Sequence, residues 1–143
     1  MKASMRWFSV ALLIVMVACN GGGSVRGMYG TCRTAGSEGE CEGGFRQLSG
    51  RYIHRIEATR HYRMGDEVFV EAWVSVEEGR VMVIIEAPDG VDIAAEAAPG
   101  EPASIAGLTT TGRMSEEVHV PIIYEALEET VTGIEYHVTF REP

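Results

Sequence analysis

The amino-acid sequence predicts an all-β protein, built as a single antiparallel β-sandwich of jelly-roll or immunoglobulin-like type. Apolar and polar residues alternate along several short segments after residue 50, which is the period of a strand with one buried face. Turn signals that contain Gly or Pro separate these segments at short intervals. No long helical pattern interrupts them, so a parallel α/β sheet is disfavoured.

About seven segments carry the strand pattern: residues 51–58, 67–76, 81–85, 91–96, 104–109, 117–123 and 134–141. In segment 67–76 the even-numbered residues are expected to face the core. Segment 81–85 is apolar on both faces and is expected at the centre of a sheet. Pro121 favours a sheet edge or a bulge for its strand. Residues 125–130 are expected to form a loop or one helical turn.

The first 18 residues have the composition of an export signal. Lys2 and Arg6 supply positive charge, and the apolar run 7–17 follows. This run is too short to span a bilayer comfortably, since roughly 20 apolar residues are needed. We therefore expect residues 1–18 to be a signal peptide that is absent from the mature protein.

Met16-Val17-Ala18-Cys19 ends this segment and resembles the lipobox of bacterial lipoproteins, in which a small residue precedes Cys. The family pattern usually begins with Leu, and Met16 departs from it with a residue of similar size and polarity. The resemblance implies cleavage before Cys19, a thioether-linked diacylglycerol on its sulfur, and an acylated amino terminus, which makes the membrane the first expected partner. The alternative is an ordinary secretory signal, which would leave Cys19 as a free thiol.

The lipoprotein resemblance also implies a location in the cell envelope. Asn20 is not the Asp that retains lipoproteins at the inner membrane, which favours the outer membrane in a host that has two membranes. Residues 20–24 read Asn-Gly-Gly-Gly-Ser, a composition typical of a flexible tether.

Charge limits the classes of partner. The formal charge is −9 for the whole chain, and removal of residues 1–18 with their two cations leaves about −11. Such a chain lacks the cationic footprint that nucleic-acid binding requires, and it is repelled by anionic lipid. The charge is uneven, because the cations concentrate between residues 19 and 63 and the acids between residues 64 and 143.

Cys32 and Cys41 bracket a short polar stretch and are expected to form a disulfide, which an extracytoplasmic location permits. A metal or redox pair is the alternative, but the spacing is too long for Cys-x-x-Cys and no His lies nearby. The chain then divides into a signal peptide (1–18), a segment with the lipidated Cys19, the tether and the disulfide loop (19–44), and the β-sandwich (45–143).

Four segments of the sandwich region, Gly-Asp-Glu-Val-Phe-Val (65–70), Gly-Arg-Val-Met-Val (79–83), Pro-Asp-Gly (88–90) and Gly-Ile-Glu-Tyr-His-Val (133–138), resemble bacterial pre-peptidase C-terminal-type domains and similar jelly rolls. The resemblance rests mostly on turn residues. It implies a non-catalytic sandwich of the kind appended to secreted proteins, and it transfers no site residues.

No catalytic motif is apparent. The serines at positions 49, 75, 104 and 115 lie outside any Gly-x-Ser-x-Gly pattern. Carboxylates are abundant, so the sequence singles out no acid–base pair. We therefore expect no enzymatic activity and no cofactor.

His119 and His137 are the metal-ligand candidates. If the last two strands pair, these two imidazoles approach each other, with Glu117 and Glu135 beside them. The alternative is that both histidines are ordinary solvent-facing strand residues, because no His-x-His or His-Glu-x-x-His motif occurs.

Two sets of side chains are candidate binding surfaces. Arg51, Arg55 and Arg60 belong to a basic segment that either binds an acidic partner or pairs with acids of the same domain. Phe69, Trp73 and Tyr124 could form an aromatic platform like those of sugar-binding sandwiches; alternatively, a second sheet packed on that face would bury Phe69 and Trp73.

The sequence thus favours a membrane-anchored extracytoplasmic lipoprotein with a non-catalytic interaction or structural β-sandwich, and an envelope protein as its partner. A glycan- or metal-binding module is the alternative, and a small enzyme is a third hypothesis.

Overall fold

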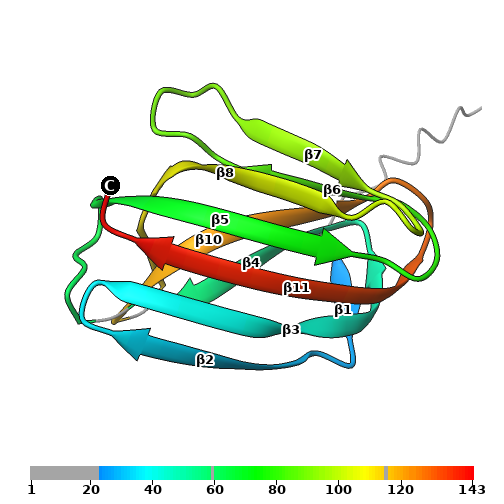
Figure 1. The fold of residues 1–143 in the computed structure, drawn as a ribbon, viewed down its shortest axis with the longest axis horizontal. Helices are drawn as coiled ribbons and strands as arrows, with labels where there is room; N and C mark the ends of the chain where they lie inside the picture. The colour runs from blue at the N-terminus through cyan, green and yellow to red at the C-terminus, as the bar shows by residue number, and fades with distance from the viewer. Residues whose placement is uncertain (1–22, 59, 115) are drawn as a thin grey trace, which may run out of the picture.

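A computed structural model describes residues 23–58, 60–114 and 116–143 (Figure 1). This part of the chain is all-β, and its strands form two antiparallel sheets packed face to face, as predicted for a β-sandwich. The expected signal peptide, Cys19 and residues 20–22 lie outside the described residues. Within those residues, the chain has no helix that is long and apolar enough to cross a membrane.

The first sheet has the strand order β1-β3-β11-β5-β8, and β2 pairs with β3 beside β1. Its strands are β1 (Ser24–Arg26), β2 (Tyr29–Ala35), β3 (Glu38–Ser49), β5 (Glu67–Ser75), β8 (Ala103–Thr110) and β11 (Val131–Arg141). In Figure 1 this sheet lies in front of the second sheet.

The second sheet has the order β4-β10-β6-β7, and β9 pairs with the beginning of β10. Its strands are β4 (Arg51–Glu57), β6 (Val81–Ile85), β7 (Ile93–Ala97), β9 (Gly112–Met114) and β10 (Glu117–Ala126). Strand β6 has a neighbour on each side, which confirms its expected central position.

The core lies between the inner faces of the two sheets. Strand β5 shows the alternation clearly, since Val68, Val70, Ala72 and Val74 are buried while the residues between them are exposed or half-buried. The even-numbered residues therefore face the core as the sequence predicts.

An aromatic cluster fills one part of this core. The His54 ring lies within 4.9–6.3 Å of the rings of Phe45, Tyr52, Tyr124 and Tyr136, measured between ring centroids. Tyr124 is fully buried, so it takes no part in a surface platform, which is one of the two alternatives for these aromatic residues. His54 is also buried.

The turn at Pro88-Asp89-Gly90 forms as predicted. The N–H of Gly90 donates to the carbonyl of Ala87, and Gly90 adopts a positive φ of 82°. The Asp89 carboxylate accepts a hydrogen bond from the N–H of Val91. The turn itself therefore explains the acid at position 89.

Residues 24–44 differ from expectation, because they form strands rather than a tether and a disulfide loop. The sequence there is poor in large apolar groups and rich in Gly, which hides the strand period. The hairpin of β2 and β3 pairs Cys32 directly with Cys41, and the predicted disulfide joins them.

Strand β10 also differs from expectation, because it lies inside its sheet and not at an edge. Pro121 pairs with Arg55 of β4 on one side. On the other side β9 pairs only up to His119 and β6 only from Ile123, so Pro121 faces the gap between them. A residue without an N–H is tolerated in such a gap. The strand continues to Ala126, where a loop or helical turn is predicted.

Candidate functional site

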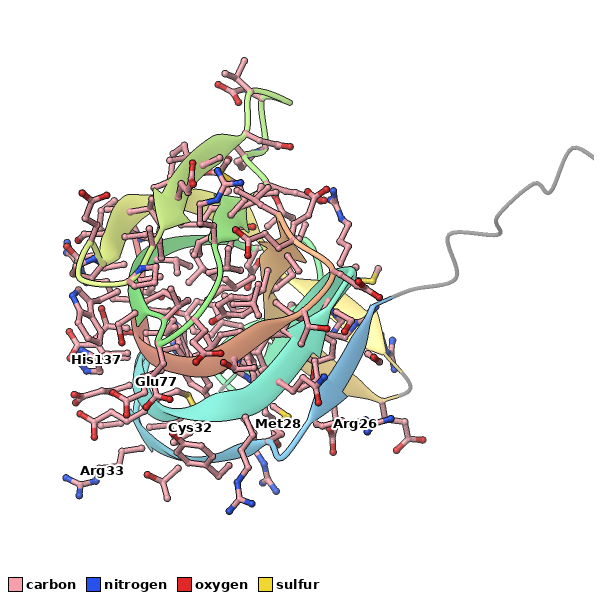
Figure 2. The ribbon with its side chains drawn as sticks, turned by 90° about the vertical axis from the view of Figure 1, so that its right-hand side faces the viewer. Arg26, Met28, Cys32, Arg33, Glu77 and His137 are labelled. Carbon is pink, nitrogen blue, oxygen red and sulfur yellow. A yellow bond between two sulfur atoms is a disulfide. The ribbon has the colours of Figure 1, made fainter. Side chains whose placement is uncertain are left out.

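The candidate site lies on the outer face of the first sheet, across β2, β3, β11 and β5. The pairing register places Thr31, Glu42, His137 and Trp73 side by side in one row. Residues opposite each other in a sheet point to the same face, so these four side chains share the outer face. Figure 2 shows His137 and Arg33 on this outer side of the molecule.

A second row runs beside the first one. It contains Arg33, Glu40, Thr139 and Glu71, which are paired in that order. Each member lies two residues along its strand from a member of the first row, and side chains two apart share a face. The two rows together make a largely polar surface that carries three carboxylates and one guanidinium.

The first row lines an open hollow with a volume of about 490 Å³. Its walls include the side chains of Tyr29, Thr31, Glu42, Trp73, Glu135 and His137. Tyr29 is 52% exposed and Trp73 is 40% exposed, so both rings are accessible from solvent. The hollow thus combines two aromatic rings with carboxylates and an imidazole.

His137 makes the closest polar contacts of this face. Its Nε2 atom lies 2.7 Å from Oε1 of Glu40 and 3.7 Å from Oε1 of Glu42. One ligand atom from each of the three side chains lies within 4.8 Å of the other two. Glu40, Glu42 and His137 are called the Glu–Glu–His cluster below.

Trp73 and Phe69 lie on this outer face and are not covered by the second sheet, so the burial alternative is wrong. The second sheet packs on the valine face of β5 instead. Phe69 is half-buried, and the guanidinium of Arg141 lies 4.7 Å from its ring centroid. The Arg141 side chain therefore covers Phe69, whereas Trp73 remains accessible in the hollow.

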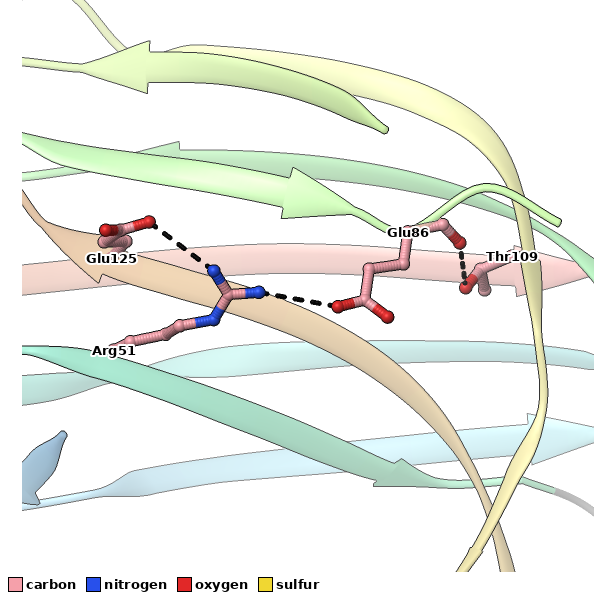
Figure 3. A network of polar contacts seen from close by, with 4 residues as sticks. All are labelled: Arg51, Glu86, Thr109 and Glu125. Atoms are coloured by element: carbon pink, nitrogen blue, oxygen red, sulfur yellow. Dashed lines mark hydrogen bonds and ion pairs between the residues drawn. The ribbon is translucent and has the colours of Figure 1, made fainter. Parts of the chain in front are cut away.

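The arginines proposed as a binding surface lie elsewhere. Arg51 belongs to the second sheet and forms ion pairs with Glu86 at 3.4 Å and with Glu125 at 3.8 Å (Figure 3). The backbone carbonyl of Glu86 accepts a hydrogen bond from Thr109, which ties this acid to the first sheet. Pairing with acids of the same domain, one of the two alternatives, is thus the observed arrangement for Arg51.

Arg55 and Arg60 do not join the aromatic residues either. Arg55 is an exposed residue of β4, in the second sheet. Arg60 lines a separate hollow of about 310 Å³ together with Glu57, Glu116 and Glu117. The arginines of the basic segment are therefore dispersed over β4 of the second sheet and the loop that follows β4.

His119 and His137 are not neighbours, which corrects the predicted metal pair. That prediction assumes that the last two strands pair, but β10 belongs to the second sheet and β11 to the first. His119 instead lies near β9, and its pKa is lowered by partial burial and by the charge of Arg55. His137 meets two carboxylates of β3 in place of a second imidazole.

Sequence reasoning missed Glu40 and Glu42 because it placed them in an irregular loop. A signal was available in the alternation of Glu38, Glu40 and Glu42 with smaller residues around Cys41. If the two cysteines are read as a directly opposed pair in a hairpin, this alternation places the carboxylates on one face.

The sequence matches no known protein family and no curated protein. Solved structures that resemble the fold include oxalate decarboxylase from Bacillus subtilis at pH 4.6, with a TM-score of 0.39 and 17% identity. Two further examples concern a structural element that modulates proton-coupled electron transfer in oxalate decarboxylase and the Mn(II) centres of the Bacillus subtilis enzyme, with the same TM-score and identity. In each case the match covers 83% of this chain and 26% of the other chain, so the chain spans about a quarter of their length.

The structures just named are all of an enzyme, which stands against the expectation that this protein is not an enzyme. With a TM-score of 0.39 and 17% identity, the similarity assigns no reaction, substrate or metal to this chain.

Proposed function

We propose that the protein is a lipoprotein of the cell envelope, anchored through lipid on Cys19, whose β-sandwich binds a ligand or an envelope protein on the outer face of the first sheet. The observation that carries the proposal is Met16-Val17-Ala18-Cys19 at the end of a charged and apolar leader. Cys19 would otherwise be an unpaired thiol, since Cys32 and Cys41 are joined to each other.

The short distance between Cys19 and the sandwich supports an anchoring role. The N–H of Gly23 donates to the carbonyl of Arg51 at 2.6 Å, and β1 begins at the next residue. Four residues of fully extended chain span at most about 14 Å. A lipid on Cys19 would therefore hold this end of the sandwich next to the bilayer.

Charge supports an outward orientation of the candidate site. Glu40, Glu42, Glu71 and Glu135 lie on the outer face of the first sheet. Anionic headgroups repel such a surface, which favours presentation of this face to the aqueous phase. The site would then be accessible to a soluble ligand or to another envelope component.

The anchoring proposal is tested with the variant Cys19→Ser expressed in a bacterial host. The wild type should incorporate radiolabelled fatty acid and sediment with membranes, and the variant should lose both properties. Met16→Leu is the matched control, because it restores the usual first residue of the lipobox and should keep both. An intact leader, or a mature terminus without acyl groups in the mass spectrum of the wild type, would contradict the proposal.

The hollow supports a second candidate function, the binding of a glycan. Tyr29 and Trp73 expose aromatic rings on which the C–H faces of a sugar can stack, and Glu42 and Glu135 offer acceptors for its hydroxyl groups. On a glycan array, Trp73→Ala should not bind the oligosaccharides that the wild type binds, whereas Phe69→Ala should still bind them. Equal retention by wild type and Trp73→Ala would exclude the hollow as the binding site.

A further inference from the structure

We propose that the Glu–Glu–His cluster is a binding site for a divalent transition-metal ion, with Zn²⁺ as the probe. This inference goes beyond the proposed function and holds whether or not Cys19 carries lipid. It replaces the pair of imidazoles predicted from the sequence with one imidazole and two carboxylates contributed by adjacent strands.

The backbone fixes the relative positions of the three residues that carry the donors. Strands β3 and β11 are matched at nine residue pairs, and His137 stands directly opposite Glu42 in this register. Glu40 and Glu42 flank Cys41 along β3, and the disulfide from Cys41 to Cys32 cross-links β3 to β2 at this position of the strand. Sites built on paired strands are held more accurately than sites on loops.

The donor distances suit a small metal ion. Zn–N and Zn–O bonds of about 2.0–2.2 Å in a tetrahedral site place two ligand atoms roughly 3.4 Å apart. The distances from Nε2 of His137 to the two carboxylates are 2.7 Å and 3.7 Å, which lie on either side of that value. These side chains are between 41% and 70% exposed, so small rotations can adjust all three.

The charge at the cluster also favours a cation. Two carboxylates surround a single imidazole, and Glu71 and Glu135 add negative charge on the same face. Arg33 pairs with Glu40 in register and balances one of these charges. A divalent ion among Glu40, Glu42 and His137 would remove the remaining repulsion between the two carboxylates.

The donor types select the class of ion. An imidazole nitrogen with two carboxylate oxygens suits Zn²⁺, Ni²⁺ or Cu²⁺, whereas Ca²⁺ and Mg²⁺ prefer ligand sets made of oxygen alone. Three protein ligands leave at least one coordination position open to water or to an incoming group.

Trp73 provides a spectroscopic reporter, because it pairs with His137 across β5 and β11. We would titrate the full chain with the substitutions Cys19→Ser and Trp7→Phe, without a polyhistidine tag. The first change removes the thiol of Cys19. The second removes one of the two tryptophans in the sequence, so that all tryptophan fluorescence comes from Trp73. Calorimetry with Zn²⁺ should give one site per chain, and Ni²⁺ or Cu²⁺ should quench Trp73 fluorescence with saturation.

Three variants test the ligands individually: His137→Gln, Glu40→Gln and Glu42→Gln. Each should weaken Zn²⁺ binding more than roughly tenfold, since even groups outside the coordination sphere commonly change metal affinity by that factor. Glu117→Gln and His119→Gln are matched controls, because they remove the same residue types from β10 of the second sheet. Both controls should bind Zn²⁺ like the parent.

Thiol titration and thermal unfolding accompany each variant, to verify that the disulfide and the fold are intact. The absence of both heat and quenching in the parent chain would overturn the proposal. So would Zn²⁺ binding that survives all three ligand variants, and its loss in His119→Gln would then place the ion on the second sheet. Because this chain carries no lipid, neither outcome bears on the anchoring proposal.

Discussion

His54 shows how one residue in a basic stretch acquires a property that its neighbours lack. Arg51 and Arg55 of the same strand reach solvent, whereas the His54 ring is enclosed by four aromatic rings between the sheets. Its Nδ1 atom is buried, and no hydrogen-bond partner for it lies among the described residues. Burial lowers the pKa of His54 from 6.5 to about 4, because the charged form is poorly solvated there.

We predict that His54 makes the folded state sensitive to acid. Between pH 6.5 and pH 4 the unfolded chain binds a proton at this residue that the folded chain does not, so stability falls as the pH falls through this window. The full effect is roughly 3 kcal/mol, since each pKa unit corresponds to about 1.4 kcal/mol. Urea unfolding at several pH values between 7 and 4 measures it.

His54→Phe is the matched variant, because it keeps an aromatic ring in the cluster and removes the titrating group. Carboxylates affect both proteins alike, so the difference between the two stability curves isolates residue 54. Parallel curves for wild type and variant over this pH range would refute the prediction.

The hairpin of β2 and β3 illustrates stabilisation at the scale of an element. Every residue of β2 is exposed, so this strand buries little apolar surface of its own. It is held by its pairing with β3 and by the disulfide between Cys32 and Cys41. The cross-link closes a loop with a sequence separation of 9 residues.

Removal of the disulfide should loosen this hairpin more than the rest of the sheet. In the chain-entropy description, a cross-link over so short a loop contributes about 2 to 3 kcal/mol. The double variant Cys32→Ala/Cys41→Ala should lose about this much free energy of unfolding, and amide exchange should accelerate first in β2. Unchanged exchange in β2, with the loss distributed evenly over the first sheet, would count against this account.

At the scale of the whole molecule, negative charge predominates. The formal charge of the complete chain is −9, and the ion pairs of Arg51 and Arg80 with neighbouring acids are at the surface. Exposed pairs of this kind contribute little to stability, because water and salt screen them and two long side chains must be ordered to form them. Repulsion between the many other acids should therefore outweigh them.

We predict that moderate salt stabilises the protein. Net charge opposes the compact state, and salt screens exposed charges over a Debye length of about 10 Å at 0.1 M. The urea midpoint should rise between 10 mM and 150 mM sodium chloride, with the slope of the transition unchanged. A midpoint that falls over this range would show that the surface ion pairs dominate instead.

The local sequence determined seven of the strands after residue 50, the buried face of β5, the Pro88–Gly90 turn and the disulfide, because a period of two and turn chemistry depend on neighbouring residues. It did not determine the strands of residues 24–44, where Gly and Glu mask the period. Only the tertiary structure decided which sheet each strand joins, since a strand's pattern specifies the face that it buries and not the strand beside it. The separation of His119 from His137, and the meeting of His137 with Glu40 and Glu42, follow from that long-range pairing.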